Sequence, residues 1–318
     1  MLELNKVHCG DALKLLKELG NGSVNCVVTS PPYWALRDYG VDGQIGLEST
    51  FEEYIKKLCY IFDEVKRILR DDGTCWVNLG DTYSESGGAG NQYGKFCGKN
   101  KIEGFKKYKG HKVSDYPSKC LTLVPFRFAT EMINRGWILR NVIIWHKPNC
   151  MPSSVKDRFT VDFEYIFFFV KQKKYWFETQ YEPYDKPMNR WGGEKLKADG
   201  VSTWDEGVGQ DTYRSRNMRP NPLGRNARAT WSICPRPFPQ AHFAVFPEEL
   251  PKKCIKAGCP ENGVVLDPFT GSGTTGLVAC ELNRNFIGFD INQEYCDMAT
   301  KRIKPYLEQT KLQEVLNN

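Results

Sequence analysis

Apolar positions along this chain follow two periods, short β-branched runs and longer stretches with helical spacing. The run from Val24 to Thr29 is typical of a buried strand, and the prolines of Ser30-Pro31-Pro32 end it because they cannot continue a ladder. From Phe51 to Leu69 apolar side chains recur every three or four residues, which predicts an amphipathic helix. Thr50 with Glu53 fits a capping box at its start, and Asp71-Asp72-Gly73 is expected to end it.

The alternation of strands and helices continues to the C-terminal part of the chain. Further strands are expected at 74–79, 138–145, 163–170, 263–267 and 286–290, and further helices at 11–19, 121–135, 247–257, 273–282 and 293–307. Strands that alternate with helices in this way favour an α/β fold with a mostly parallel sheet.

Two long segments, 84–119 and 186–236, break this rhythm. Loops of this length inside a compact domain are usually functional or disordered. The net charge of the whole chain is only +6, but residues 95–119 hold eight Lys against two acids, and residues 186–236 hold ten Lys and Arg against five acids. The positive charge is therefore concentrated in these two segments, and the remaining scaffold is net acidic.

Composition removes several classes of protein. With 318 residues, 41% hydrophobic and 26% charged, the chain is an ordinary globular protein. Its first residues carry no signal-peptide pattern, and its most apolar stretch, Val161 to Val170, is about half a membrane span and contains two acids. The 12 cysteines show no ligand spacing, so we expect reduced thiols, a cytoplasmic location and no metal site.

A glycine-rich segment near the C-terminus points to a nucleotide-like ligand. Gly271, Gly273 and Gly276 form a GxGxxG pattern that follows an expected strand ending at Asp267 and opens an expected helix. A second acid, Asp290, ends the next strand, where an acidic side chain can bind ribose hydroxyls. The pattern predicts a nucleoside cofactor, and by itself it leaves a dinucleotide and S-adenosylmethionine both open.

The turn after the first long strand, Ser30-Pro31-Pro32-Tyr33, carries a different chemistry. Two prolines hold the backbone rigidly at the carboxyl end of a strand, where open α/β sheets bind ligands. A hydroxyl precedes the prolines and an aromatic ring follows them. Such a turn suits a planar base with an exocyclic amine: Ser30 and the Pro31 carbonyl would accept from the amine, and Tyr33, with Trp34, would stack on the ring.

These two motifs together resemble those of the DNA amino-methyltransferases of restriction–modification systems. Because the Ser-Pro-Pro-Tyr block comes first and the cofactor loop last, the chain resembles the beta group, from Val7 to about Ile303. The resemblance implies a circularly permuted, Rossmann-like fold dependent on S-adenosylmethionine. It further implies a catalytic half at 1–170, a target-recognition insertion at 171–228 and a cofactor-binding half at 229–318.

The resemblance also implies roles for individual residues. The catalytic turn is Ser30, Pro31, Pro32 and Tyr33. The expected cofactor-binding residues are Asp11, Ala12, Phe246, Asp267, Phe269, Gly271, Ser272, Gly273, Thr274 and Asp290. No role is assigned to Asp81, His146 or Lys147.

The implied reaction moves a methyl group from S-adenosylmethionine to the N4 amine of a cytosine flipped out of duplex DNA, since Ser at the first motif position favours cytosine. Adenine N6 is the main alternative. An RNA methyltransferase shares the chemistry, but the Arg- and Asn-rich segment suits duplex readout better. A nicotinamide-dependent oxidoreductase leaves the Ser-Pro-Pro-Tyr turn unexplained, and a non-catalytic DNA-binding module leaves the intact motifs unexplained.

Double-stranded DNA is the expected macromolecular partner. Lysines of the first basic segment suit phosphates, whereas arginines of the second suit base edges. A cognate restriction endonuclease and a second copy of the chain are further candidate partners. The expected DNA contacts are Lys106, Lys107, Lys109, Arg214, Arg216, Arg219, Arg225 and Arg228.

Overall fold

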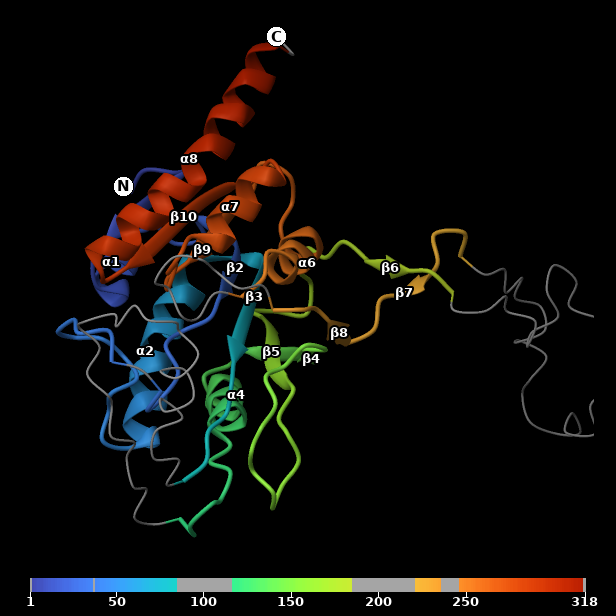
Figure 1. Cartoon of the computed structure of the whole chain (residues 1–318). Helices are drawn as coiled ribbons and strands as arrows, with labels where there is room; N and C mark the ends of the chain where they lie inside the picture. Colours follow the sequence, from blue (N-terminus) through green and yellow to red (C-terminus); the bar gives the residue numbers. More distant parts are fainter. Residues whose placement is uncertain (1, 37, 85–115, 185–220, 236–245, 317–318) are drawn as a thin grey trace, which may run out of the picture. The chain divides into compact units, whose positions relative to one another are not determined.

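A computed structural model describes residues 2–36, 38–84, 116–184, 221–235 and 246–316, with side chains of the last helix described to Glu308. The chain divides into two compact units, one made of Met1–Glu178 with Ala229–Asn318 and the other of Thr179–Arg228. The elements of both units are labelled in Figure 1.

One large sheet organises the first unit. Its five parallel strands are followed by β5 and β4, where β5 is antiparallel to both of its neighbours, and the edge strand β8 is parallel to β4. The strands lie in the order β1 (Lys6–Cys9), β10 (Asn285–Asp290), β9 (Val264–Asp267), β2 (Val24–Thr29), β3 (Leu69–Leu79), β5 (Phe163–Val170), β4 (Ile138–His146) and β8 (Thr230–Ser232) (Figure 1).

Helices cover both faces of this sheet and bury two separate apolar clusters. Successive side chains of a strand point to opposite faces, so Val27 and Val77 pack in one cluster while Cys26 and Trp76 pack in the other. The first cluster lies under α1 (Ala12–Lys17), α2 (Phe51–Ile68) and α4 (Val124–Asn134). The second lies under α6 (Glu249–Gly258), α7 (Thr274–Glu281) and α8 (Gln293–Leu316).

The phenylalanine-rich strand β5 lies inside the sheet, and its apolar residues from Ile166 to Val170 are buried on both faces, as their pattern predicts. Phe168 stacks on its cross-strand neighbour Trp76, with ring centres 3.9 Å apart and an angle of 1° between the rings. Phe167 and Phe169 enter the opposite cluster. Paired aromatic rings of this kind add to the stability of adjacent strands.

Most expected elements of the first unit are confirmed, several with shifted ends. The strands at 24–29 and 163–170 have the predicted bounds, and Thr50 caps α2 by accepting from the Glu53 amide at 3.2 Å. The prediction that residues 71–73 separate α2 from the next strand is wrong. Strand β3 begins at Leu69, directly after the helix, because an irregularity in its pairing with β2 accommodates the polar residues.

Two short strands of the first unit were not predicted from the sequence pattern. β1 has four residues and β8 has three, which is too short to show a period. Both are formed by pairing with strands distant in sequence: Cys9 pairs with Asp290, and Trp231 pairs with Trp145.

The second unit contains a two-stranded antiparallel sheet among its described residues. It is formed by β6 (Tyr181–Glu182) and β7 (Arg225–Asn226). Across the whole described part of the chain, no helix is long and apolar enough to cross a membrane. The cysteines described are free thiols.

Candidate active site

The strands that carry the two sequence motifs, β2 and β9, are neighbours at the centre of the sheet. Val27 pairs with Leu266, and the Thr29 hydroxyl donates to Oδ1 of Asp267 at 2.6 Å. From this point the chain order runs in opposite directions, since β9 pairs with β10 on one side and β2 with β3 on the other. Such a reversal is where open α/β sheets bind their ligands, beyond the carboxyl ends of the strands.

Asp267 is buried, with 2% of its surface exposed, and its carboxylate is used internally. Besides Thr29, it accepts from the Thr275 hydroxyl at 2.7 Å and from the Phe269 amide at 3.0 Å. Burial raises the pKa of Asp267 from 3.8 to about 6, although these hydrogen bonds oppose the rise. The side chain thus ties together β2, the loop after β9 and the helix α7.

The loop between β9 and α7 needs glycine for two reasons. Gly271 and Gly273 have φ angles of 51° and 81°, in the left-handed region that side chains disfavour. A Cβ atom on Gly273 would also lie 2.9 Å from the Cβ of Ala299, so glycine lets α8 approach the loop. We call residues 268–273 the glycine loop.

Asp290 lies at the end of β10, beside the glycine loop and the start of α1. Its two carboxylate oxygens accept from the amides of Gly271 and Asn292, each at 2.9 Å. Its carbonyl accepts from Gly10 at 2.8 Å, and the next residue, Asp11, caps α1 by accepting from the Lys14 amide. Burial raises the pKa of Asp290. Asp290 therefore connects the end of β10 to the glycine loop through its side chain and to the residue before Asp11 through its carbonyl.

Arg302 of α8 binds two hydroxyls, one in the glycine loop and one at the start of α7. Its guanidinium donates to Ser272 Oγ at 3.2 Å and to Thr274 Oγ1 at 2.8 Å, and it also pairs with Glu248 at 2.8 Å. Ser272 and Thr274 are buried, so their visible role is to hold the loop.

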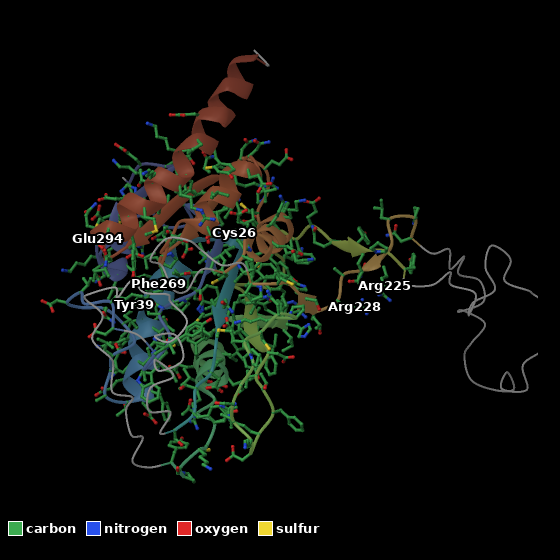
Figure 2. All side chains as sticks on the ribbon, viewed as in Figure 1. Cys26, Tyr39, Arg225, Arg228, Phe269 and Glu294 are labelled. Carbon is green, nitrogen blue, oxygen red and sulfur yellow. The ribbon has the colours of Figure 1, made fainter. Side chains whose placement is uncertain are left out.

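The remaining residues expected to bind the cofactor lie at the edges of the apolar clusters. Phe246 packs against the cluster of α6, α7 and α8, and Phe269 packs against the opposite one. Ala12 is buried at the start of α1. Phe269, labelled in Figure 2, comes two residues after the end of β9.

The Ser-Pro-Pro-Tyr turn is held by side chains from β3 and β5. Oδ1 of Asn78 accepts from the Ser30 hydroxyl at 3.3 Å and lies 3.1 Å from the Tyr33 hydroxyl oxygen. The Asn78 amide nitrogen donates to the Tyr165 carbonyl at 3.1 Å, which is consistent with this amide orientation. Asn78 therefore links the serine and the tyrosine of the turn.

A second contact fixes the ring of Tyr33. Its hydroxyl donates to Oε2 of Glu164 at 2.7 Å, and the other carboxylate oxygen of Glu164 pairs with Lys147. Burial, and then the neighbouring carboxylate, raise the pKa of the Tyr33 phenol, which therefore stays protonated. Gly80 leaves room for the ring, since a Cβ there would lie 2.7 Å from Tyr33 Cε2.

The expectation that Trp34 joins Tyr33 in stacking on a base is wrong. Trp34 is only 3% exposed and belongs to the apolar core. Its indole donates to the Glu48 carbonyl at 3.0 Å, and its ring meets Phe51 edge-on at 5.8 Å. Pro32 is likewise anchored, because its carbonyl accepts from the Tyr54 hydroxyl at 2.8 Å.

Sequence reasoning did not identify three residues that support the turn, namely Asn78, Glu164 and Lys147. Asn78 is the penultimate residue of β3, which is parallel to β2, and sequence patterning could have used this position as a signal. Glu164 and Lys147 reach the turn only because β5 and β4 are antiparallel, and nothing in their local sequence shows this. Asp81 has a local role, since it accepts from the Val124 amide at the start of α4.

Most of the expected DNA contacts lie outside the described residues, namely Lys106, Lys107, Lys109, Arg214, Arg216 and Arg219. Arg225 and Arg228 are described, and both lie on the segment that contains β7 (Figure 2). Each forms an ion pair with Glu182, at 2.7 and 2.6 Å.

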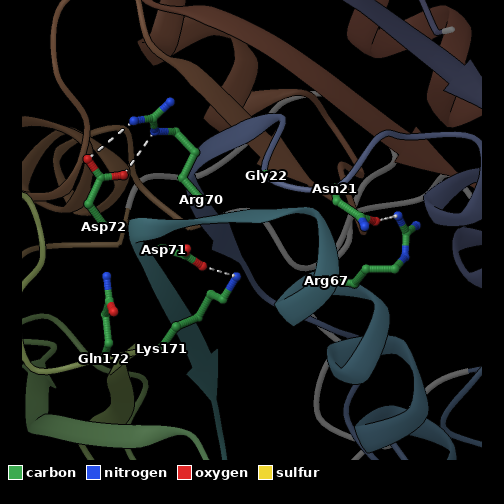
Figure 3. Close-up of a pocket in the computed structure, with 8 residues that line it drawn as sticks. All are labelled: Asn21, Gly22, Arg67, Arg70, Asp71, Asp72, Lys171 and Gln172. Carbon is green, nitrogen blue, oxygen red and sulfur yellow. Dashed lines mark hydrogen bonds and ion pairs between the residues drawn. The ribbon is translucent and has the colours of Figure 1, made fainter.

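A pocket of about 580 Å³ lies at the opposite, amino-terminal edge of the strands (Figure 3). It is lined by residues that precede β2, lie around the start of β3 and follow β5, and its ion pairs include Arg70 with Asp72 and Lys171 with Asp71. It is therefore separate from the edge where the motifs meet. Among the described residues, no group of His, Cys, Asp or Glu could hold a metal ion.

Comparisons with known proteins show the family of this chain. A family model described as DNA methylase, N6_N4_Mtase, matches residues 24–301. Type II methyltransferase M.XycI of Xanthomonas campestris pv. cyanopsidis is 41% identical over 93% of this chain and 86% of its own length. Type II methyltransferase M.SmaI of Serratia marcescens is 40% identical, over 94% and 90%.

Solved structures share the fold. The PvuII DNA methyltransferase, described as cytosine-N4-specific, aligns with a TM-score of 0.61 and 20% identity over 96% of this chain and 91% of that one. A putative DNA modification methylase from Thermus thermophilus, complexed with S-adenosyl-L-methionine, aligns with a TM-score of 0.56 and 21% identity over 95% and 93%. The chain thus has the Rossmann-like fold of DNA methyltransferases, and it belongs to the N6_N4_Mtase family of DNA methylases.

Proposed function

We propose that this chain is a type II, site-specific DNA methyltransferase that transfers a methyl group from S-adenosylmethionine to the N4 amine of a flipped cytosine. The observation that carries the proposal is the hydrogen bond from Thr29 to Asp267, at 2.6 Å. It joins the strand that presents the Ser-Pro-Pro-Tyr turn to the strand that presents the glycine loop. A base held by the turn and a nucleoside held by the loop would share one crevice.

The residues at the glycine loop fit S-adenosylmethionine. Each carboxylate oxygen has two lone pairs, so Asp290 keeps acceptor capacity beyond its amide bonds and suits a ribose diol. Phe269 belongs to the loop, Asp11 and Ala12 begin α1 next to Gly10, whose amide donates to the Asp290 carbonyl, and Gly271 lets the backbone come close to a ligand. When bound, this cofactor supplies an electrophilic methyl group on a sulfonium.

The Ser30 hydroxyl has one proton, and it donates that proton to Asn78. Its lone pairs are therefore directed to accept from the amine of the target base, with the Pro31 carbonyl as the second acceptor. Hydrogen bonds accepted from the amine stabilise the positive charge that develops on nitrogen during transfer. Ser30 is too weak a base to deprotonate the amine first, so proton loss follows methyl transfer.

Tyr33 supplies a ring on which the flipped base would stack. Flipping costs a few kcal/mol, and stacking on an aromatic side chain returns about 1–3 kcal/mol. Glu164 and Asn78 hold the Tyr33 hydroxyl, so the ring is oriented before the base arrives. Such preorganisation reduces the entropy lost on binding.

Two observations support cytosine N4 over adenine N6. Ser30 occupies the first motif position, and a solved structure that shares the fold is described as cytosine-N4-specific. Adenine N6 is the alternative, since the family model spans both chemistries. The order of the motifs supports a circular permutation of the beta-group type. A target-recognition role for residues 171–228 stays a prediction, as do the endonuclease partner and the homodimer.

Expression in cells that lack DNA methylation, followed by sequencing with base-modification mapping, tests the proposal. We expect 4-methylcytosine at one recognition sequence and none with Ser30→Ala. Removing a preorganised hydrogen-bond partner should lower kcat about 100- to 1,000-fold while cofactor binding survives. Methylated adenine would overturn the base assignment. Methyl transfer only to RNA, or none at all, would overturn the function.

A further inference from the structure

The loop between β4 and β5, residues 147–162, carries an unusual density of exposed apolar side chains. Phe159 is 96% exposed, and Met151, Val155 and Val161 are each about half exposed. A fully exposed phenylalanine gains nothing from the hydrophobic effect in the free protein. A cluster of this kind marks a surface that meets another molecule.

The chain on both sides of Phe159 is held in place. Before it, Asp157 pairs with Lys119 at 2.7 Å, and the guanidinium of Arg158 lies 4.1 Å from the ring centre of Tyr83. After it, the Asp162 carbonyl accepts from the Lys147 amide at 2.7 Å. Phe159 is thus exposed on a loop that is fastened at both ends.

This loop lies at the edge of the sheet that carries the Ser-Pro-Pro-Tyr turn. β5 is antiparallel to β3, so its first residues lie beside the last residues of β3, and Leu79 pairs with Tyr165. Phe159 is five positions before Glu164, the residue that binds the Tyr33 hydroxyl. A duplex that delivers a base to Tyr33 must therefore approach the loop.

The charges beside the phenylalanine suit a nucleic acid. Lys156 and Arg158 precede it closely, and cations next to an exposed apolar side chain are typical of proteins that bind phosphates and insert between base steps. Resting on the proposed function, we infer that Phe159 is a wedge. It enters the base stack of duplex DNA and fills the space that the flipped base leaves.

The first test compares Phe159→Ala with the wild type on two duplexes that carry the mapped recognition sequence, one fully paired and one with a mismatch opposite the target base. A mismatch lowers the cost of flipping. We expect kcat/KM to fall at least tenfold on the paired duplex and to recover to within about threefold on the mismatched one. Equal losses on both duplexes, or no loss on either, would overturn the inference.

Phe177→Ala is the matched control, because Phe177 is a phenylalanine with 45% of its surface exposed that stacks on Phe168 within this unit. We expect it to leave the ratio of the two kcat/KM values unchanged. Urea unfolding of both variants confirms that each is folded. If Phe177→Ala changes this ratio as much as Phe159→Ala does, the loop has no special role and the inference fails.

The second test does not depend on catalysis. A Phe159→Trp variant places an indole at the proposed wedge. The fluorescence emission of this indole is obtained by subtracting the wild-type emission from that of the variant. We expect added duplex to quench this difference emission, because an inserted indole stacks on bases. Unchanged emission at saturating duplex would overturn the wedge. If the wild type methylates no DNA, the proposed function fails, whereas the emission test with mixed-sequence duplex still decides whether Phe159 enters the base stack.

Discussion

The hydroxyl of Tyr33 donates to Oε2 of Glu164 at 2.7 Å. This contact joins a turn of the parallel part of the sheet to its antiparallel part, and Lys147 neutralises the carboxylate from the other side. The aromatic ring of the Ser-Pro-Pro-Tyr turn is therefore oriented by residues more than one hundred positions away in sequence.

Removing the hydroxyl of Tyr33 should slow methyl transfer without unfolding the protein. A hydrogen bond to a charged group contributes about 1.5–3 kcal/mol, so Tyr33→Phe should lower the single-turnover rate roughly 10- to 100-fold. Glu164→Gln should have a similar effect, and the double variant should be little worse than either one. Arg70→Met, which breaks the exposed ion pair with Asp72, is the control and should leave the rate unchanged. Additive effects of the two changes would contradict the coupling.

Asn78 should act through Ser30. With Asn78→Ala the serine hydroxyl loses its acceptor and is free to rotate, so we expect kcat to fall at least tenfold while the KM for S-adenosylmethionine changes less than threefold. Steady-state kinetics of Ser30→Ala, Asn78→Ala and the double variant measure this. If Asn78 only positions Ser30, the double variant matches Ser30→Ala. A further loss in the double variant would show an independent role.

Arg302 should influence cofactor binding through the glycine loop. Arg302→Met removes the donors to Ser272 and Thr274 and the ion pair with Glu248. We expect about a tenfold rise in the Kd for S-adenosylmethionine, measured by calorimetry, because the loop loses its support from α8. Lys301→Met changes the neighbouring exposed lysine and should leave the Kd unaltered. Equal Kd values for Arg302→Met and the wild type would refute this role.

Asp267 should make the stability of the protein depend on pH. Its pKa is about 6 in the folded state against 3.8 for the free group, so between these values the folded state holds a proton that the unfolded state has lost. The unfolding free energy therefore falls as pH rises, by about 2 kcal/mol between pH 4.5 and 7.5. Urea titrations of the wild type and Asp267→Asn isolate this contribution. The wild type should lose stability relative to the variant over this interval, and a constant difference would contradict the assignment.

Local sequence determined most of the scaffold. Short β-branched runs and helical periods located the central strands and the covering helices because these patterns match the spacing of side chains on each element. The glycine loop followed from spacing as well, since left-handed backbone at Gly271 and Gly273 requires glycine. The two short strands and the start of β3 did not follow, because pairing with distant strands creates them.

For the site, the sequence by itself determined which residues are proposed to bind the base and the cofactor, Ser30, Tyr33, Asp267 and Asp290. Only the tertiary structure decided how they are supported. Antiparallel pairing of β5 brings Glu164 to Tyr33, and parallel pairing of β3 brings Asn78 to Ser30. Trp34 is buried in the apolar core, so it does not join Tyr33 at the proposed base-binding face of the turn. Strand order is a property of the whole sheet, and a local pattern specifies which residues form a strand but not which strand lies beside it.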